Sequence, residues 1–105
     1  MNIVCKQGVW FSKVDDLFFE FAEALTEVWE KWGDTPTLTS AADGKHMEGS
    51  KHYIAEAWDL RVWGLHNPLA MSDALRARLN QDGEKWIVLY GDAHHKDHIH
   101  VQTNG

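Results

Sequence analysis

The stretch KWIVLYGDAHHKDHIHVQT, residues 85–103, decides the fold of this chain. It contains two β-favouring runs, Lys85–Tyr90 and His98–Thr103, separated by the polar segment GDAHHKD. Two such runs joined by a short polar segment with a glycine are typical of a β-hairpin. We therefore expect two antiparallel strands here.

Within the second run, side chains alternate between the two faces of the strand. His98 and His100 are therefore expected on one face, with Ile99 on the other. Both imidazoles can serve one site, where one binds a metal and its neighbour hydrogen-bonds a reacting oxyanion. The alternative is that this histidine pair is only a polar strand edge.

The rest of the chain predicts helices as well as strands. A helical period of apolar residues follows Asp15 and Asp16 and stops at Gly33; it comprises Leu17, Phe18, Phe21, Ala22, Leu25, Val28, Trp29 and Trp32. We expect this stripe to lie in the core. The other expected elements are a strand over Thr37–Ser40, a strand over Ala57–Trp63, a turn over Gly64–Pro68, and a second helix from a cap at Ser72 to Leu79.

These elements do not form a regular βαβ repeat, and 105 residues suit one domain. We therefore expect a single α+β domain over residues 1–105, with an antiparallel sheet and flanking helices.

Composition excludes several classes of protein. The net charge is −6 with ten Lys and Arg, so the basic surface of a nucleic-acid-binding protein is absent. Cys5 is the only cysteine, and any metal site must therefore use histidine and carboxylate. No long apolar run and no export signal is visible, so we expect a monomer that is cytoplasmic on synthesis and has no membrane partner.

The seven histidines suggest where such a metal site lies. Five of them crowd two segments that also carry three aspartates: His52, His94, His95, His98 and His100, with Asp59, Asp92 and Asp97. A catalytic zinc takes three protein ligands of these types and keeps one position for water. His52 and Asp59 are an odd number of residues apart, so the chain must bend around Tyr53–Glu56 if both are to address one site.

Two motifs resemble those of the zinc D-alanyl-D-alanine carboxypeptidases and murein endopeptidases, a family that includes phage L-alanyl-D-glutamate peptidases. The segment SKHYIAEAWD, residues 50–59, is similar to the family pattern S-x-H-x-x-G-x-A-x-D. The segment HKDHIH, residues 95–100, matches a second signature, E-or-H-x-x-H-x-H. The order and spacing of the two motifs agree with the family.

The resemblance implies a Hedgehog/D,D-peptidase-like fold and a Zn²⁺ ion bound by His52, Asp59 and His100. It implies that His98 contacts the reacting group and that His95 serves as, or supports, the general base. Asp92 and Asp97 are rival proton-transfer groups. The implied reaction is hydrolysis of an amide bond in a peptidoglycan stem peptide, by a phage or prophage lysis enzyme that acts at the cell wall once released.

The chain departs from the family at two places. Ala55 replaces the glycine of the first motif, and Asp43 stands where a T-S-x-x-R element has an arginine that grips a substrate carboxylate. Lys45, Lys51 and Arg61 are the candidates for a replacement cation. Two other functions remain open: a non-catalytic zinc-binding structural protein and a metal-dependent nuclease, the latter disfavoured by the acidic charge.

Overall fold

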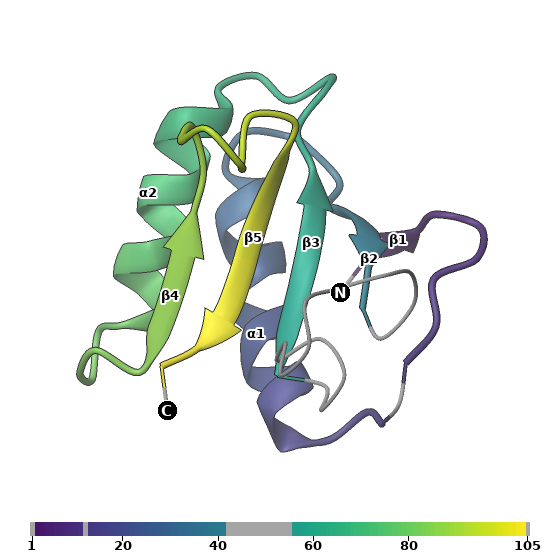
Figure 1. Cartoon of the computed structure of the whole chain (residues 1–105). Coiled ribbons are helices and arrows are strands. Elements are labelled where there is room, and N and C mark those ends of the chain that lie inside the picture. Colours follow the sequence, from purple (N-terminus) through teal and green to yellow (C-terminus); the bar gives the residue numbers. More distant parts are fainter. Residues whose placement is uncertain (1, 12, 42–55, 105) are drawn as a thin grey trace.

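The computed structural model describes residues 2–11, 13–41 and 56–104. In these ranges, one five-stranded sheet carries both helices on the same face (Figure 1). The elements are β1 (Val4–Cys5), α1 (Asp16–Glu30), β2 (Thr37–Ser40), β3 (Ala57–Arg61), α2 (Pro68–Leu79), β4 (Trp86–Leu89) and β5 (His98–Thr103). The expected α+β class is confirmed. No helix in the described ranges has the length and apolar character needed to cross a bilayer.

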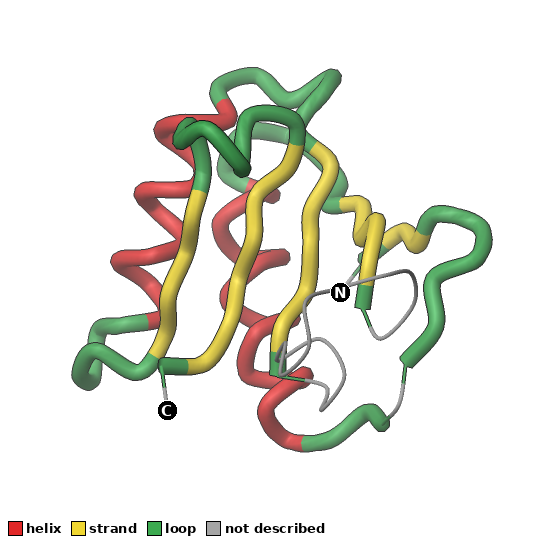
Figure 2. The backbone as a smooth tube through the Cα atoms, viewed as in Figure 1, coloured by secondary structure: helices red, strands yellow, loops and turns green. Residues whose placement is uncertain are grey.

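The sheet is mixed, so the expectation of an antiparallel sheet is confirmed for the β2–β3, β3–β5 and β4–β5 pairs and is wrong for β1. Its strand order is β1-β2-β3-β5-β4, and Figure 2 shows the strands side by side. The predicted hairpin of β4 and β5 is present and antiparallel, whereas β1 pairs with β2 in parallel through Val4 and Thr37. A strand of two residues is too short to show a period in the sequence. The two expected helices are present, and both pack on one face of the sheet.

Helix α1 begins and ends close to its predicted limits. The side chain of Asp15 accepts a hydrogen bond from the backbone N–H of Phe18, which caps the helix. Gly33 follows the helix with a φ of 71°, a left-handed conformation that glycine adopts without strain. The predicted apolar stripe lies in the core, where Leu25 and Trp29 are fully buried.

The packing of α1 on β3 decides which way each β3 side chain points. The ring of Phe21 stacks on the ring of Trp58 with centroids 4.7 Å apart and planes at 6°. Trp58 and Leu60 are fully buried beneath the helices. Because strand side chains alternate, Asp59 and Arg61 lie on the opposite face. We call this face, turned away from both helices, the site face.

Helix α2 begins earlier than predicted. Pro68 occupies its first turn, and the side chain of Asn67 caps it by accepting a hydrogen bond from Ala70 N at 3.1 Å. Ser72, the expected cap, is buried inside the helix, and its hydroxyl donates to the Leu69 carbonyl. A proline at the end of a turn and a proline at the start of a helix look alike in sequence. Strand β3 correspondingly ends at Arg61 and does not continue to Trp63.

Candidate metal centre

Asp59 and His100 face each other across the central strand pair. They are direct register partners of β3 and β5, and Nδ1 of His100 lies 2.9 Å from Oδ1 of Asp59. The side chain of His100 is 13% exposed, and that of Asp59 is 14% exposed. The structure therefore brings together two of the three residues that the resemblance implies as metal ligands, in a largely buried position where a charge needs a partner.

The second ring nitrogen of His100 is also engaged. Its Nε2 lies 2.7 Å from Oε1 of Gln102, the next residue of β5 on the site face. Burial of the ring opposes protonation, but hydrogen bonds to Asp59 and Gln102 outweigh burial and raise the pKa of His100. In its doubly protonated form, the imidazole donates from Nε2 to Gln102 and from Nδ1 to Asp59. Sequence analysis missed Gln102, although the same alternation that groups His98 with His100 extends to it.

His98 lies beside this pair. Its Nε2 is 3.9 Å from Oδ1 of Asp59, and its Nδ1 is 2.7 Å from Oδ1 of Asp97. The hydrogen bond from the His98 ring is the main reason why the pKa of Asp97 is lowered. The Asp97 side chain is 90% exposed, so it anchors the ring from the solvent side. His98 is therefore held with its Nε2 directed toward Asp59.

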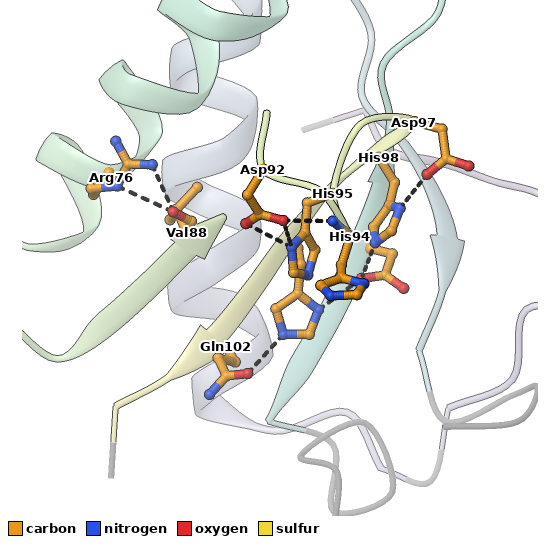
Figure 3. Close-up of polar contacts among 10 residues, drawn as sticks. Arg76, Val88, Asp92, His94, His95, Asp97, His98 and Gln102 are labelled. Carbon is orange, nitrogen blue, oxygen red and sulfur yellow. Dashed lines mark hydrogen bonds and ion pairs between the residues drawn. The ribbon is translucent and has the colours of Figure 1, made fainter. Parts of the chain in front are cut away.

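His95 reaches the cluster from the turn between β4 and β5. The Asp92 side chain accepts a hydrogen bond from the backbone N–H of His94 at 2.9 Å, an Asx-type turn. The backbone N–H of Gly91 donates to the His95 carbonyl, which closes the turn. The same Asp92 carboxylate holds Nδ1 of His95 at 2.7 and 2.9 Å from its two oxygens (Figure 3).

The three imidazoles form one cluster. The ring centroid of His95 is 5.3 Å from that of His98 and 5.6 Å from that of His100. Each ring has a carboxylate at Nδ1, the arrangement that orients a histidine and sets its tautomer. For His95, a proton on Nδ1 shared with Asp92 leaves the lone pair of Nε2 free to accept a proton. The hydrogen bonds from His95 and from the His94 N–H lower the pKa of Asp92, which makes Asp92 a weaker base.

The donors present fit a zinc ion in part. Bond lengths of about 2.0–2.1 Å in a tetrahedral site place neighbouring ligand atoms about 3.3 Å apart. The 2.9 Å between Asp59 and His100 is therefore close to what a shared ion requires. Within residues 2–11, 13–41 and 56–104, no three His, Cys, Asp or Glu side chains are arranged to hold a metal. His52, the third expected ligand, lies outside the described residues, as do Lys45, Lys51 and most of the expected bend at Tyr53–Glu56.

Comparison of the chain with protein-family models, curated proteins and solved structures gives no match.

Proposed function

We propose that this chain is a zinc-dependent metallopeptidase that hydrolyses amide bonds in peptidoglycan stem peptides, on a Hedgehog/D,D-peptidase-like fold. The observation that carries the proposal is the contact of Asp59 with His100, with the rings of His95 and His98 grouped around it. A histidine and a carboxylate in contact, with oriented imidazoles beside them, are the parts that metal-assisted hydrolysis requires. The choice of peptidoglycan depends on the resemblance of the two motifs, and release as a phage or prophage lysis enzyme is part of the same inference.

His100 and Asp59 would hold the metal from β5 and β3, with His52 as the third ligand. Loss of the Nδ1 proton from His100 exposes a lone pair toward Asp59, while Gln102 keeps the Nε2 proton and fixes the ring. When bound, zinc supplies polarisation of the scissile carbonyl and acidification of a water molecule. Two of the three proposed ligands, Asp59 and His100, are therefore already oriented by the fold.

His95 would transfer protons in the reaction, first as a general base and then as a general acid. Its Nε2 takes the proton from the attacking water as the new carbon–oxygen bond forms. It then gives this proton to the amine nitrogen as the carbon–nitrogen bond breaks, which leaves a carboxylic acid and an amine. The acid then gives its remaining proton to the amine or to solvent and becomes a carboxylate. Asp92 holds His95 through Nδ1 and stays ionised because its pKa is lowered by that hydrogen bond.

His98 would stabilise the negative charge that develops on the carbonyl oxygen. In its doubly protonated form it donates from Nε2, which already points toward Asp59. Asp97 receives the opposite ring N–H and prevents rotation of the imidazole. His98 is placed between Asp59 and the turn that carries His95, so one substrate carbonyl can meet both rings.

The direct test incubates the zinc-loaded chain with purified murein sacculi and, separately, with DNA, and identifies released fragments by mass spectrometry. His100→Ala is expected to lose zinc. His95→Ala is expected to keep zinc and lose cleavage by about 10²–10⁴-fold. His94→Ala is the matched control, because its backbone N–H contact with Asp92 survives the substitution.

Each outcome separates the candidate functions. Murein fragments cut at an amide bond support the peptidase. Zinc bound without turnover would support a non-catalytic zinc-binding protein, and cleavage of DNA with intact murein would support a nuclease. Equal zinc binding by the wild type and His100→Ala would show that His100 is not a zinc ligand and would contradict the proposed metal centre.

A further inference from the structure

Trp63 lies in solvent on a tightly built turn that follows β3. The backbone N–H of Leu65 donates to the Val62 carbonyl at 3.2 Å, so Trp63 and Gly64 are the central residues of a β-turn. Gly64 has a φ of 84°, a value that is typical of the third residue of a type II turn and that glycine adopts without strain. Val62 and Leu65 pack against the core, whereas Trp63 is 69% exposed. The turn therefore presents the indole to solvent.

The indole of Trp63 is fixed on one face and open on the other. The guanidinium of Arg61 lies over the ring, with Cζ 4.0 Å from the ring centroid. Because a planar ring has two faces, an exposed fraction of 69% with one face covered leaves the opposite face in solvent. A rigid aromatic ring that is already oriented loses little entropy when a ligand lies flat on it.

The turn is also tied to the segment that precedes β2. The Asp34 carboxylate accepts hydrogen bonds from the backbone N–H and the Nδ1 of His66, at 3.1 and 2.8 Å. These two bonds join the chain after β3 to the chain before β2. The surroundings of Trp63 are thus held in place from both segments.

A hollow of about 210 Å³ lies between these segments, where β3 ends and β2 begins. Asp34, Thr35 and Thr37 form a polar wall, and Arg61 and Trp63 belong to the rest of the lining. Pockets for drug-sized molecules usually measure about 300 Å³ or more, so this hollow suits a single small ring. Its lining combines an aromatic ring with groups that donate and accept hydrogen bonds.

The charges around the hollow favour a neutral polar ligand. Asp34 supplies one negative charge and Arg61 one positive charge, so the lining selects neither an anion nor a cation. Partial burial opposes ionisation of Asp34, but hydrogen bonds from His66 outweigh burial and lower the pKa of this carboxyl. Each oxygen of an ionised carboxylate can accept two hydrogen bonds, so Asp34 can still accept one from a ligand hydroxyl.

We propose that Trp63 and this hollow bind a neutral sugar ring of the glycan strand to which stem peptides are attached. The inference rests on the proposed function, and it adds a second point of attachment to the same polymer. The C–H bonds on one face of a pyranose ring carry small positive charges, which suit the negative face of an indole. Hydroxyl groups at the edge of the ring then meet the Asp34 carboxylate and the hydroxyl of Thr37.

The open face of Trp63 lies at the same end of the sheet as the histidine cluster. Arg61, which contacts the Trp63 ring, is the register partner of His98. Figure 1 shows the loop after β3 and the turn between β4 and β5 at one end of the sheet. Two residues of strand span about 7 Å, which is the step along β3 from Asp59 to Arg61. A stem peptide of a few residues can therefore reach from a sugar on Trp63 to the proposed metal centre.

The test measures binding of a soluble sugar and needs neither metal nor cleavage. Chitotriose, a chain of β-linked N-acetylglucosamine units, is titrated into the metal-free ¹⁵N-labelled protein. Cellotriose, which has the same linkage without acetamido groups, is titrated separately. The reporter is the indole Nε1–H signal of Trp63, assigned by its absence in Trp63→Phe. The chain has six tryptophans, and the signals of the others serve as internal controls.

We expect chitotriose to shift the Trp63 signal and to bind at least as tightly as cellotriose. Trp63→Ala should weaken binding about tenfold or more, the usual effect of removing an aromatic ring on which a ligand stacks. Thr37→Val keeps the branched shape and removes the hydroxyl, so it should weaken binding about threefold. Trp10→Ala is the matched control, because Trp10 is 61% exposed but does not line the hollow, and it should bind as the wild type does.

No shift of the Trp63 signal with chitotriose at about 10 mM would overturn the inference. Equal binding by the wild type and Trp63→Ala would do so as well. Tighter binding of cellotriose would assign the hollow to a different glycan and would also contradict the proposal. If Trp63→Ala does not fold, the shift of the Trp63 signal relative to the other indole signals of the wild type decides the question.

The inference and the proposed function fail in different ways. Murein cleavage without sugar binding would contradict the inference and leave the peptidase unaffected. Sugar binding without cleavage would count against the peptidase alone, because the binding readout is independent of it.

Discussion

Nδ1 of His100 lies 2.9 Å from Oδ1 of Asp59, although the two residues are 41 positions apart in the chain. The contact joins β3 to its neighbour β5, the strand that carries His98 and His100. Gln102 continues the contact on the other side of the ring.

Gln102→Leu should lower zinc affinity about 10–100-fold, the usual effect of removing the outer partner of a metal-binding histidine. The His100 Nε2–H would lose its acceptor, and the ring would no longer be fixed toward Asp59. Competition with a fluorescent chelator measures the affinity. Gln102→Glu keeps an acceptor at this position and should bind zinc within a few fold of the wild type. Wild-type affinity in the leucine variant would show that Gln102 does not position His100.

The Asp34–His66 contact should make stability depend on pH at the acidic end. Partial burial opposes ionisation of Asp34, but hydrogen bonds from the His66 backbone and ring outweigh burial and lower the pKa of Asp34. A carboxylate with a lowered folded-state pKa adds stability above its unfolded value of about 3.9, and this stability is lost as the pH falls through the folded value. Asp34→Asn should therefore lower the free energy of unfolding by more at pH 6 than at pH 3.5.

Urea denaturation of the wild type and Asp34→Asn at both pH values measures this difference. Asp82→Asn, a change at an exposed position after α2, is the control and should show little dependence. An equal loss of unfolding free energy at both pH values in Asp34→Asn would show that contact with His66 does not lower the pKa of Asp34.

Asn67→Ala should destabilise the protein by about 1 kcal/mol, because Ala70 N at the start of α2 loses its side-chain acceptor. Asn67→Asp keeps the acceptor and should be close to neutral. Thermal or urea unfolding gives both values. If the alanine variant is as stable as the wild type, the side chain of Asn67 does not cap α2.

Asn80→Ala should expose the outer edge of β4. The Asn80 side chain donates to the Trp86 carbonyl at 3.0 Å and accepts from the Trp86 N–H at 2.8 Å, so it occupies backbone groups that another strand would pair with. Losing both hydrogen bonds should cost about 1–3 kcal/mol.

The variant should also associate at high concentration, which sedimentation velocity detects. Gln81→Ala, next to Asn80 and exposed, is the control. A monomeric Asn80→Ala variant with wild-type stability would show that this side chain does not protect the edge.

Local patterns in the sequence predicted much of the fold. The apolar period of α1 is a property of fifteen consecutive residues, and the alternation in β5 is a property of six. Both patterns were found because helix and strand geometry repeat over neighbouring residues. The predicted start of α2 was wrong because both Ser72 and Asn67 are residue types that cap helices. The packing of Met71 and Leu75 in the core decides between them.

Non-local pairing could not be predicted in the same way. Strand β1 consists of two residues whose partner lies more than thirty positions away, and no local period reveals it. The position of Arg61 beside His98 likewise required the register of β3 against β5, and the other two candidate cations, Lys45 and Lys51, lie outside the described residues.

The sequence by itself determined which side chains share a face: His98, His100 and Gln102 alternate with buried residues along β5 because successive strand side chains point to opposite sides. Only the tertiary structure decided that Asp59 meets His100. That meeting depends on strand register, and register follows from burial of Trp58 against Phe21 and of Ile99 and Val101 in the shared core, a cooperative effect of residues distant in sequence.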